Sequence, residues 1–116
     1  MAQATFDVEL ALLSPGKAER ILRGRLVSSC VFEDRAAQGW GLIIRERAQK
    51  GGSLSEKLNG LLYLLRGSES LICGCHPILR VAVFNPNLTL TTVLDDLKGV
   101  CALGAKIEFS VYPVDD

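Results

Sequence analysis

The sequence predicts an α+β fold, a mainly antiparallel sheet with helices packed on one face, and three patterns in its last third indicate this. Large aliphatic residues alternate with other residues over Leu79–Phe84 and again over Ile107–Tyr112, as they do in strands with one buried face. The apolar residues between them are spaced as on one stripe of a helix: Val93, Leu94, Leu97, Val100 and Cys101. This strand, helix and strand set the fold class but name no activity.

The length and composition predict a single domain over residues 1–116. With 48% hydrophobic and 22% charged residues, the chain can bury one core and does not have the composition of a disordered protein. No apolar run approaches the roughly 18 residues of a membrane span, and acidic residues stand where a signal peptide needs basic ones. We therefore expect a cytoplasmic protein with reduced cysteines and no membrane partner.

The N-terminal part is expected to form a strand and then a short helix. Phe6–Leu12 alternates apolar and polar residues, which predicts a strand. Ser14 followed by Pro15 is typical of a helix start, and Gly24 predicts its end. The residues expected to face inward are Ala18, Ile21 and Leu22.

Two further strands are predicted over Arg25–Glu33 and Gly39–Arg47, joined by a loop into a hairpin. Trp40 shares the face of Leu42 and Ile44, which favours a place in the core. The alternative is that its ring stands on the open sheet face as an interface anchor.

The strongest predicted helix is Leu54–Leu65. Ser53 and Glu56 form a capping box before it, and Gly67 follows it. Its apolar stripe consists of Leu54, Leu58, Leu61, Leu62 and Leu65. A helical turn is expected within Ser68–Pro77.

The rest of the chain completes a β-α-β-β-α-β-α-β order. Asn85–Asn87 predicts a turn, Thr92–Asp95 predicts the start of the last helix, and Gly104 predicts its end. The first six elements match a ferredoxin-like split βαβ plan, to which the last helix and strand are added. Polar alternation in the outer strands predicts that one face of the sheet is open.

Three segments also carry a resemblance to a known family. They are Gly39–Leu42, the leucine-rich helix Leu54–Leu65, and the ending from Leu94 to Phe109. Together they resemble a family of small bacterial α+β proteins of unknown function, some of whose members look like immunity proteins. The resemblance implies a protein that binds and neutralises a toxin, and it implies no catalytic residue.

Charge is balanced overall, with 13 basic and 13 acidic residues, so no nucleic acid or anionic membrane is expected as a partner. Residues 17–50, however, hold eight basic and four acidic residues. This excess could attract an acidic protein, or it could be an ordinary solvated face. The candidate partner-binding residues, on the open face or in this basic region, are Arg35, Arg45, Arg47, Lys50 and Phe84.

Catalysis is not expected, because His76 is the sole histidine and no convincing triad surrounds it. Cys73, Cys75 and His76 could contribute to a metal site, but their spacing lacks the matched second pair of zinc sites. The simpler interpretation is a tight loop with buried thiols, and we predict no cofactor. The alternative function is a small-molecule-sensing or regulatory domain that acts as a homodimer.

Overall fold

A computed structural model describes residues 3–48, 52–87 and 97–114, and the predicted α+β class is confirmed. The strands are β1 (Thr5–Leu12), β2 (Cys30–Arg35), β3 (Gly41–Glu46), β4 (Pro77–Asn85) and β5 (Lys106–Pro113). The helices are α1 (Ala18–Leu26), α2 (Leu54–Leu64), α3 (Glu69–Cys73) and α4 (Lys98–Leu103). A single 3₁₀ turn, Ala36–Gln38, joins β2 to β3.

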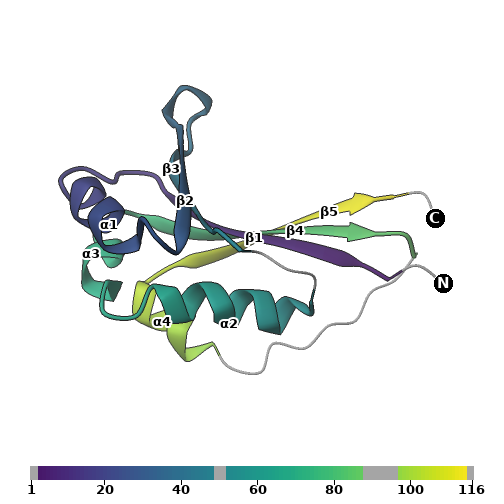
Figure 1. The fold of residues 1–116 in the computed structure, drawn as a ribbon. Helices are drawn as coiled ribbons and strands as arrows, with labels where there is room; N and C mark the ends of the chain where they lie inside the picture. The colour runs from purple at the N-terminus through teal and green to yellow at the C-terminus, as the bar shows by residue number, and fades with distance from the viewer. Residues whose placement is uncertain (1–2, 49–51, 88–96, 115–116) are drawn as a thin grey trace.

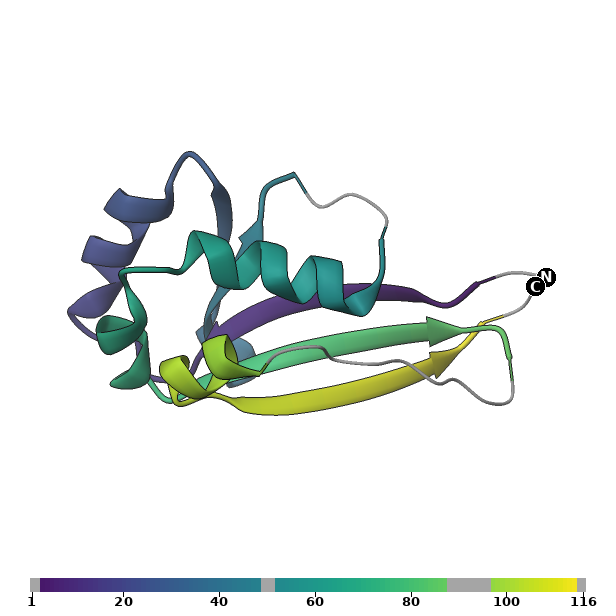
Figure 2. The ribbon, with the colours of Figure 1, turned by 90° about the horizontal axis from the view of Figure 1, so that it is seen from below.

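The described strands form one mixed sheet in the order β2-β3-β1-β4-β5. The pairings β2–β3, β3–β1 and β1–β4 are antiparallel, and β4–β5 is parallel. The N-terminal strand therefore lies in the centre, and β5 lies at an outer edge (Figure 2). Figure 1 shows the β2–β3 hairpin turned steeply away from β1, β4 and β5, on the side opposite α2.

The core lies between the sheet and α2. Residues of β1 alternate in burial, and the buried ones contribute to one apolar cluster with Leu54, Leu58 and Leu61 of α2. The predicted cap of this helix is confirmed in part, because the Ser53 hydroxyl accepts a hydrogen bond from the Glu56 amide at 3.1 Å. Leucines spaced three and four apart thus cover the sheet.

Gly41 permits a close approach between β3 and β1. Its φ is +72°, and a Cβ atom there would lie 2.2 Å from the Leu12 carbonyl oxygen. Only glycine fits both the backbone conformation and the space.

The predicted limits of the first helix are wrong at both ends. Gly16 has a φ of +51° and forms a turn, so the helix begins at Ala18 rather than beside Pro15. It then continues through Gly24, because Leu26 lies one turn after Leu22 and both are buried. The following strand consequently begins at Cys30 and not at Arg25. Ile21, expected inside, is 46% exposed.

The C-terminal elements also differ from expectation. Val100 and Leu103 of α4 are buried, whereas Cys101 of the same helix and Leu97, which precedes it, are exposed. The predicted helix start at Thr92–Asp95, with Val93 and Leu94, lies outside the described residues. Phe109 and Val111 of β5 were expected on a buried face but are 50% and 63% exposed. Phe109 and Val111 are exposed because β5 is an edge strand. Of the three residues expected on its buried face, only Ile107 packs against the described core.

Candidate functional site

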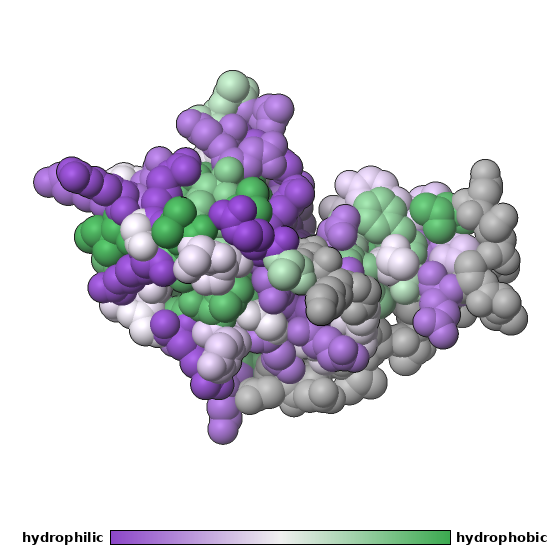
Figure 3. Space-filling model, viewed as in Figure 1, coloured by the Kyte–Doolittle hydropathy of each residue, from purple (hydrophilic) through white to green (hydrophobic). Residues whose placement is uncertain are grey.

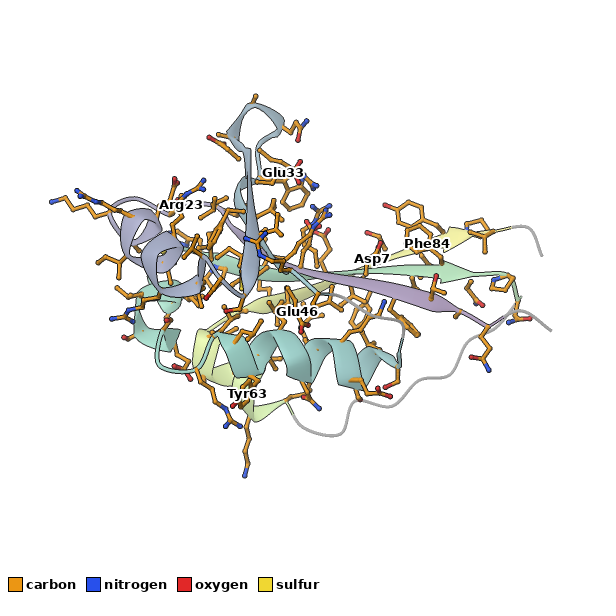
Figure 4. The ribbon with its side chains drawn as sticks, viewed as in Figure 1. Asp7, Arg23, Glu33, Glu46, Tyr63 and Phe84 are labelled. Carbon is orange, nitrogen blue, oxygen red and sulfur yellow. The ribbon has the colours of Figure 1, made fainter. Side chains whose placement is uncertain are left out.

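The sheet face opposite α2 carries charged and aromatic side chains and is the candidate functional site. On β1 and β4 these residues alternate with the buried ones, so the same strand period that builds the core also places them outside. Figure 4 shows Asp7 and Phe84 pointing away from α2, with Glu33 on the hairpin that stands on the same side. We call this surface the open face.

Glu9 is the centre of an ion-pair cluster on the open face. Its Oε1 accepts hydrogen bonds from Arg45 Nη2 at 2.7 Å and Arg45 Nε at 3.1 Å. Its Oε2 accepts from Arg80 Nη1 at 2.9 Å and pairs with Arg35 Nη1 at 3.5 Å. The Glu9 side chain is only 12% exposed, and these contacts hold three guanidinium groups in fixed positions.

Aromatic rings lie on both sides of this cluster. The Arg80 guanidinium lies 3.8 Å from the centre of the Trp40 ring, a cation–π contact. Phe84 and Tyr112, from neighbouring strands, stack with ring centres 5.4 Å apart. Trp40 is half-buried and is absent from the apolar core, so the expectation of a core tryptophan is wrong, and its contact with Arg80 places the ring on the open face. The tryptophan precedes β3, and its backbone is not held in the strand alternation of Leu42 and Ile44.

A recess of about 210 Å³ lies between the charged and aromatic parts. The principal side chains that line it are Glu9, Arg35, Arg45, Arg80, Phe84 and Tyr112. Figure 3 shows this recess between the β2–β3 hairpin and the projecting end of β4 and β5, where hydrophobic residues reach the surface. We call it the open-face recess.

Acidic residues balance much of the positive charge here. Besides Glu9, Glu108 lies 3.4 Å from Arg80 and Glu33 lies 2.8 Å from Arg35. The hydrogen bond from Arg35 lowers the pKa of the Glu33 carboxyl, and the same bond raises the pKa of Arg35. These ion pairs fix the directions in which the arginine side chains point. The excess of basic residues in 17–50 therefore does not produce an unbalanced positive surface in the recess.

The structure brings together three of the five residues predicted to bind a partner. Arg35, Arg45 and Phe84 all line the open-face recess. Arg47 instead donates hydrogen bonds to the backbone carbonyls of Val27 and Cys30, at 2.9 and 3.1 Å. Lys50 lies outside the described residues.

The prediction omitted Glu9 and Arg80, which organise the recess. Both are polar residues in alternating strands, and they are direct partners in the β1–β4 register. The opposite charges of Glu9 and Arg80 would have predicted a cross-strand pair only if β1 and β4 had been assumed to be neighbours.

The Cys73, Cys75 and His76 segment lies at the other end of the sheet. Cys75 is buried, its Sγ lies 3.1 Å from the Leu71 carbonyl oxygen, and burial raises the pKa of its thiol. Cys73 is exposed and lines a pocket of about 320 Å³ with His76 and Lys106. The two thiols thus have different surroundings, since one is held by the backbone and the other faces solvent.

Across the described residues, no group of three His, Cys, Asp or Glu side chains is arranged to hold a metal ion. None of the helices in the same ranges has the length and apolar character needed to cross a membrane. Comparison with known proteins finds no family model, curated protein or solved structure that matches this chain.

Proposed function

We propose that this protein binds another protein through its open face and that it has no catalytic role. The observation that carries the proposal is the set of arginine and aromatic side chains around Glu9. Arginine, tryptophan and tyrosine are the residues most often found at the energetic centre of protein interfaces. Here Arg45, Arg80 and Trp40 lie on the side of the sheet that α2 does not cover.

The fixed geometry supports this role. A side chain that is ordered before binding loses less conformational entropy when the partner arrives. Glu9 orders Arg45 and Arg80, and Arg80 in turn covers the Trp40 ring. A partner could contact the Arg45 side chain, which remains 44% exposed, with an acidic or carbonyl group.

The resemblance to immunity-like proteins makes a toxin the proposed partner, with this protein acting as its inhibitor in the bacterial cytoplasm. Under that proposal the open face would cover the active site of the toxin.

The strand order β4-β1-β3-β2 and its antiparallel pairings also support a ferredoxin-like plan, with β5 as the added strand.

At the open face, the size of the recess favours a protein partner over an enclosed small molecule. Pockets that enclose a small ligand usually hold about 300–1,000 Å³, whereas the open-face recess holds about 210 Å³. The pocket beside Cys73 and His76, at about 320 Å³, falls within that range and keeps a small ligand as the alternative. A sensing domain remains the second candidate, and it predicts a rise in melting temperature with a metabolite and not with a protein.

A photo-crosslinking experiment tests the proposal. Benzoylphenylalanine is introduced at Phe84 on the open face or at Tyr63 on α2, which lies on the opposite side of the molecule (Figure 4). Irradiation in the source cells should yield a protein adduct from position 84 and none from position 63. Adducts from both positions, or from position 63 alone, would remove the open face from the proposal.

The recovered partner then tests the toxin hypothesis. Expressed alone, it should arrest growth, and co-expression of this protein should relieve the arrest. Arg45→Ala should weaken binding about tenfold or more, as loss of a central interface arginine commonly does. Arg20→Ala, at an exposed arginine of α1, is the matched control and should bind normally. A non-toxic partner would retain the binding role and exclude inhibition of a toxin.

A further inference from the structure

The two edges of the sheet are protected differently. An edge strand presents unpaired backbone groups, and proteins usually protect such strands with charged residues, prolines or short lengths. The β2 edge has six residues, ends in Glu33, Asp34 and Arg35, and leads directly into a 3₁₀ turn. It therefore carries the features that discourage pairing with another chain.

The β5 edge lacks this protection over half of its length. It has eight residues, of which the charged Lys106 and Glu108 stand at its beginning and Pro113 at its end. The remainder exposes Phe109, Val111 and Tyr112 at 50%, 63% and 48%. Within the described part of the chain, β5 pairs with β4 alone. An exposed apolar edge of this length is a template for strand pairing.

We propose that β5 pairs with β5 of a second copy of this chain, in antiparallel orientation, so that two five-stranded sheets join into one. A two-fold axis through Phe109 would place this residue opposite its own copy. Ile107 would then lie opposite Val111 of the second copy, so the apolar face would continue across the seam. Cross-strand aromatic and β-branched pairs of this kind stabilise sheets.

Charge and Pro113 select this register over its two neighbours. With Phe109 on the axis, Glu108 lies opposite Ser110, and Lys106 lies opposite Tyr112, so no like charges face each other. A shift of two residues in one direction places Glu108 opposite Glu108 of the second copy, which destabilises an antiparallel pair. A shift in the other direction sets Pro113, which has no amide hydrogen to donate, opposite Ile107.

This pairing does not depend on the proposed partner-binding role. It uses the backbone edge of β5, although Tyr112 of that strand also lines the open-face recess. Its test is the mass of the purified protein by light scattering from about 1 μM to 1 mM, the range of weak association. We expect the mass to rise from 12.6 kDa toward twice that value. A monomer throughout the range overturns the proposal, and so does an extended segment of a different protein found on this edge in its place.

Matched variants locate the interface. Val111→Lys should raise the dissociation constant of the dimer at least about tenfold, and Val31→Lys at the β2 edge should leave it unchanged, since Val31 is also an exposed valine of an edge strand. A dimer lost only with Val31→Lys, or with neither variant, contradicts pairing through β5. Circular dichroism confirms that both variants fold.

A cysteine at the two-fold axis tests the register. In a chain with Cys73→Ser and Cys101→Ser, which removes the exposed thiols, Phe109→Cys should form a disulfide-linked dimer with oxidised glutathione. Val31→Cys in the same background should not. Equal crosslinking of the two variants would refute the register, whatever the effect of the lysine substitutions.

Discussion

Replacement of Glu9 by glutamine should destabilise the protein more than its place on an open sheet face would indicate. The substitution keeps the size of the side chain and removes the charge that three arginines share. Exposed ion pairs contribute about 0.2–1 kcal/mol each, but here the carboxylate is only 12% exposed and makes four contacts at 2.7 to 3.5 Å. Without it, three guanidinium groups repel one another across the recess.

The expected loss follows from these contacts. We assign about 1 kcal/mol each to the contacts with Arg45 and Arg80 and a small remainder to the longer contact with Arg35, or about 2 kcal/mol in total. An unfolding entropy of about 2.1 cal/mol/K per residue converts this to a fall in melting temperature of about 8 °C for 116 residues.

Two spectroscopic signals measure the effect. Circular dichroism during urea unfolding gives the free energy of unfolding. The emission of Trp40, the single tryptophan, should shift to longer wavelength as Arg80 loses its anchor and uncovers the ring. Asp7→Asn is the control, because Asp7 is an exposed carboxylate of the same strand face. If Glu9→Gln lies within about 0.5 kcal/mol of the parent, as a neutral surface substitution does, the ion-pair argument is wrong.

Four other predictions concern parts of the molecule outside the recess. Gly41→Ala should lower the free energy of unfolding in urea by about 3 kcal/mol or more, since its Cβ would meet a carbonyl oxygen of β1. Gly39→Ala, at a position with a similar positive φ but open space, should lower it by about 1 kcal/mol. Equal losses would contradict the close-approach argument. Arg47→Ala should cost about 1 kcal/mol, because it removes two hydrogen bonds to backbone carbonyls, and partner binding should remain normal. A thiol reagent should modify two cysteines rapidly in the native state and all four after denaturation, because Cys30 and Cys75 are buried. A native protein in which all four thiols react equally fast would contradict this burial. Burial raises the pKa of both buried thiols above the ordinary 9.0, so the unfolded state loses these protons first and the free energy of unfolding should fall as pH rises past about 9. A free energy of unfolding that stays constant as pH rises through about 9 would contradict the pH prediction.

Local sequence patterns were enough to predict the helices and strands whose boundaries depend on their own residues. The strand β4 alternates regularly, so Leu79–Phe84 was predicted correctly as strand, although β4 extends from Pro77 to Asn85. The helix α2 combines a serine cap with leucines on one stripe, and it was predicted to within one residue. The start of α1 was not, because Ser14 and Pro15 resemble a helix start in any context. Only the positive φ of Gly16 shows that the chain turns there first.

The candidate site was predicted in part for the same reason. Alternation identified a polar sheet face, and Arg45 and Phe84 follow from it. Glu9 and Arg80 are 71 positions apart, and their contact exists only because β1 and β4 pair in one register. Periodicity assigns a residue to a face, but it does not say which strands are neighbours.

The central position of β1 has a consequence for the order of folding. The first strand of the chain must remain unpaired on one side until β4 has been synthesised, because Thr5 pairs with Phe84 and Leu12 with Pro77. Closing such long loops costs entropy before the contacts form, which slows folding. A nascent chain ending before residue 77 would thus carry β1 with one edge unpaired and its apolar face incompletely covered. At that stage of synthesis the chain would be most open to binding by chaperones.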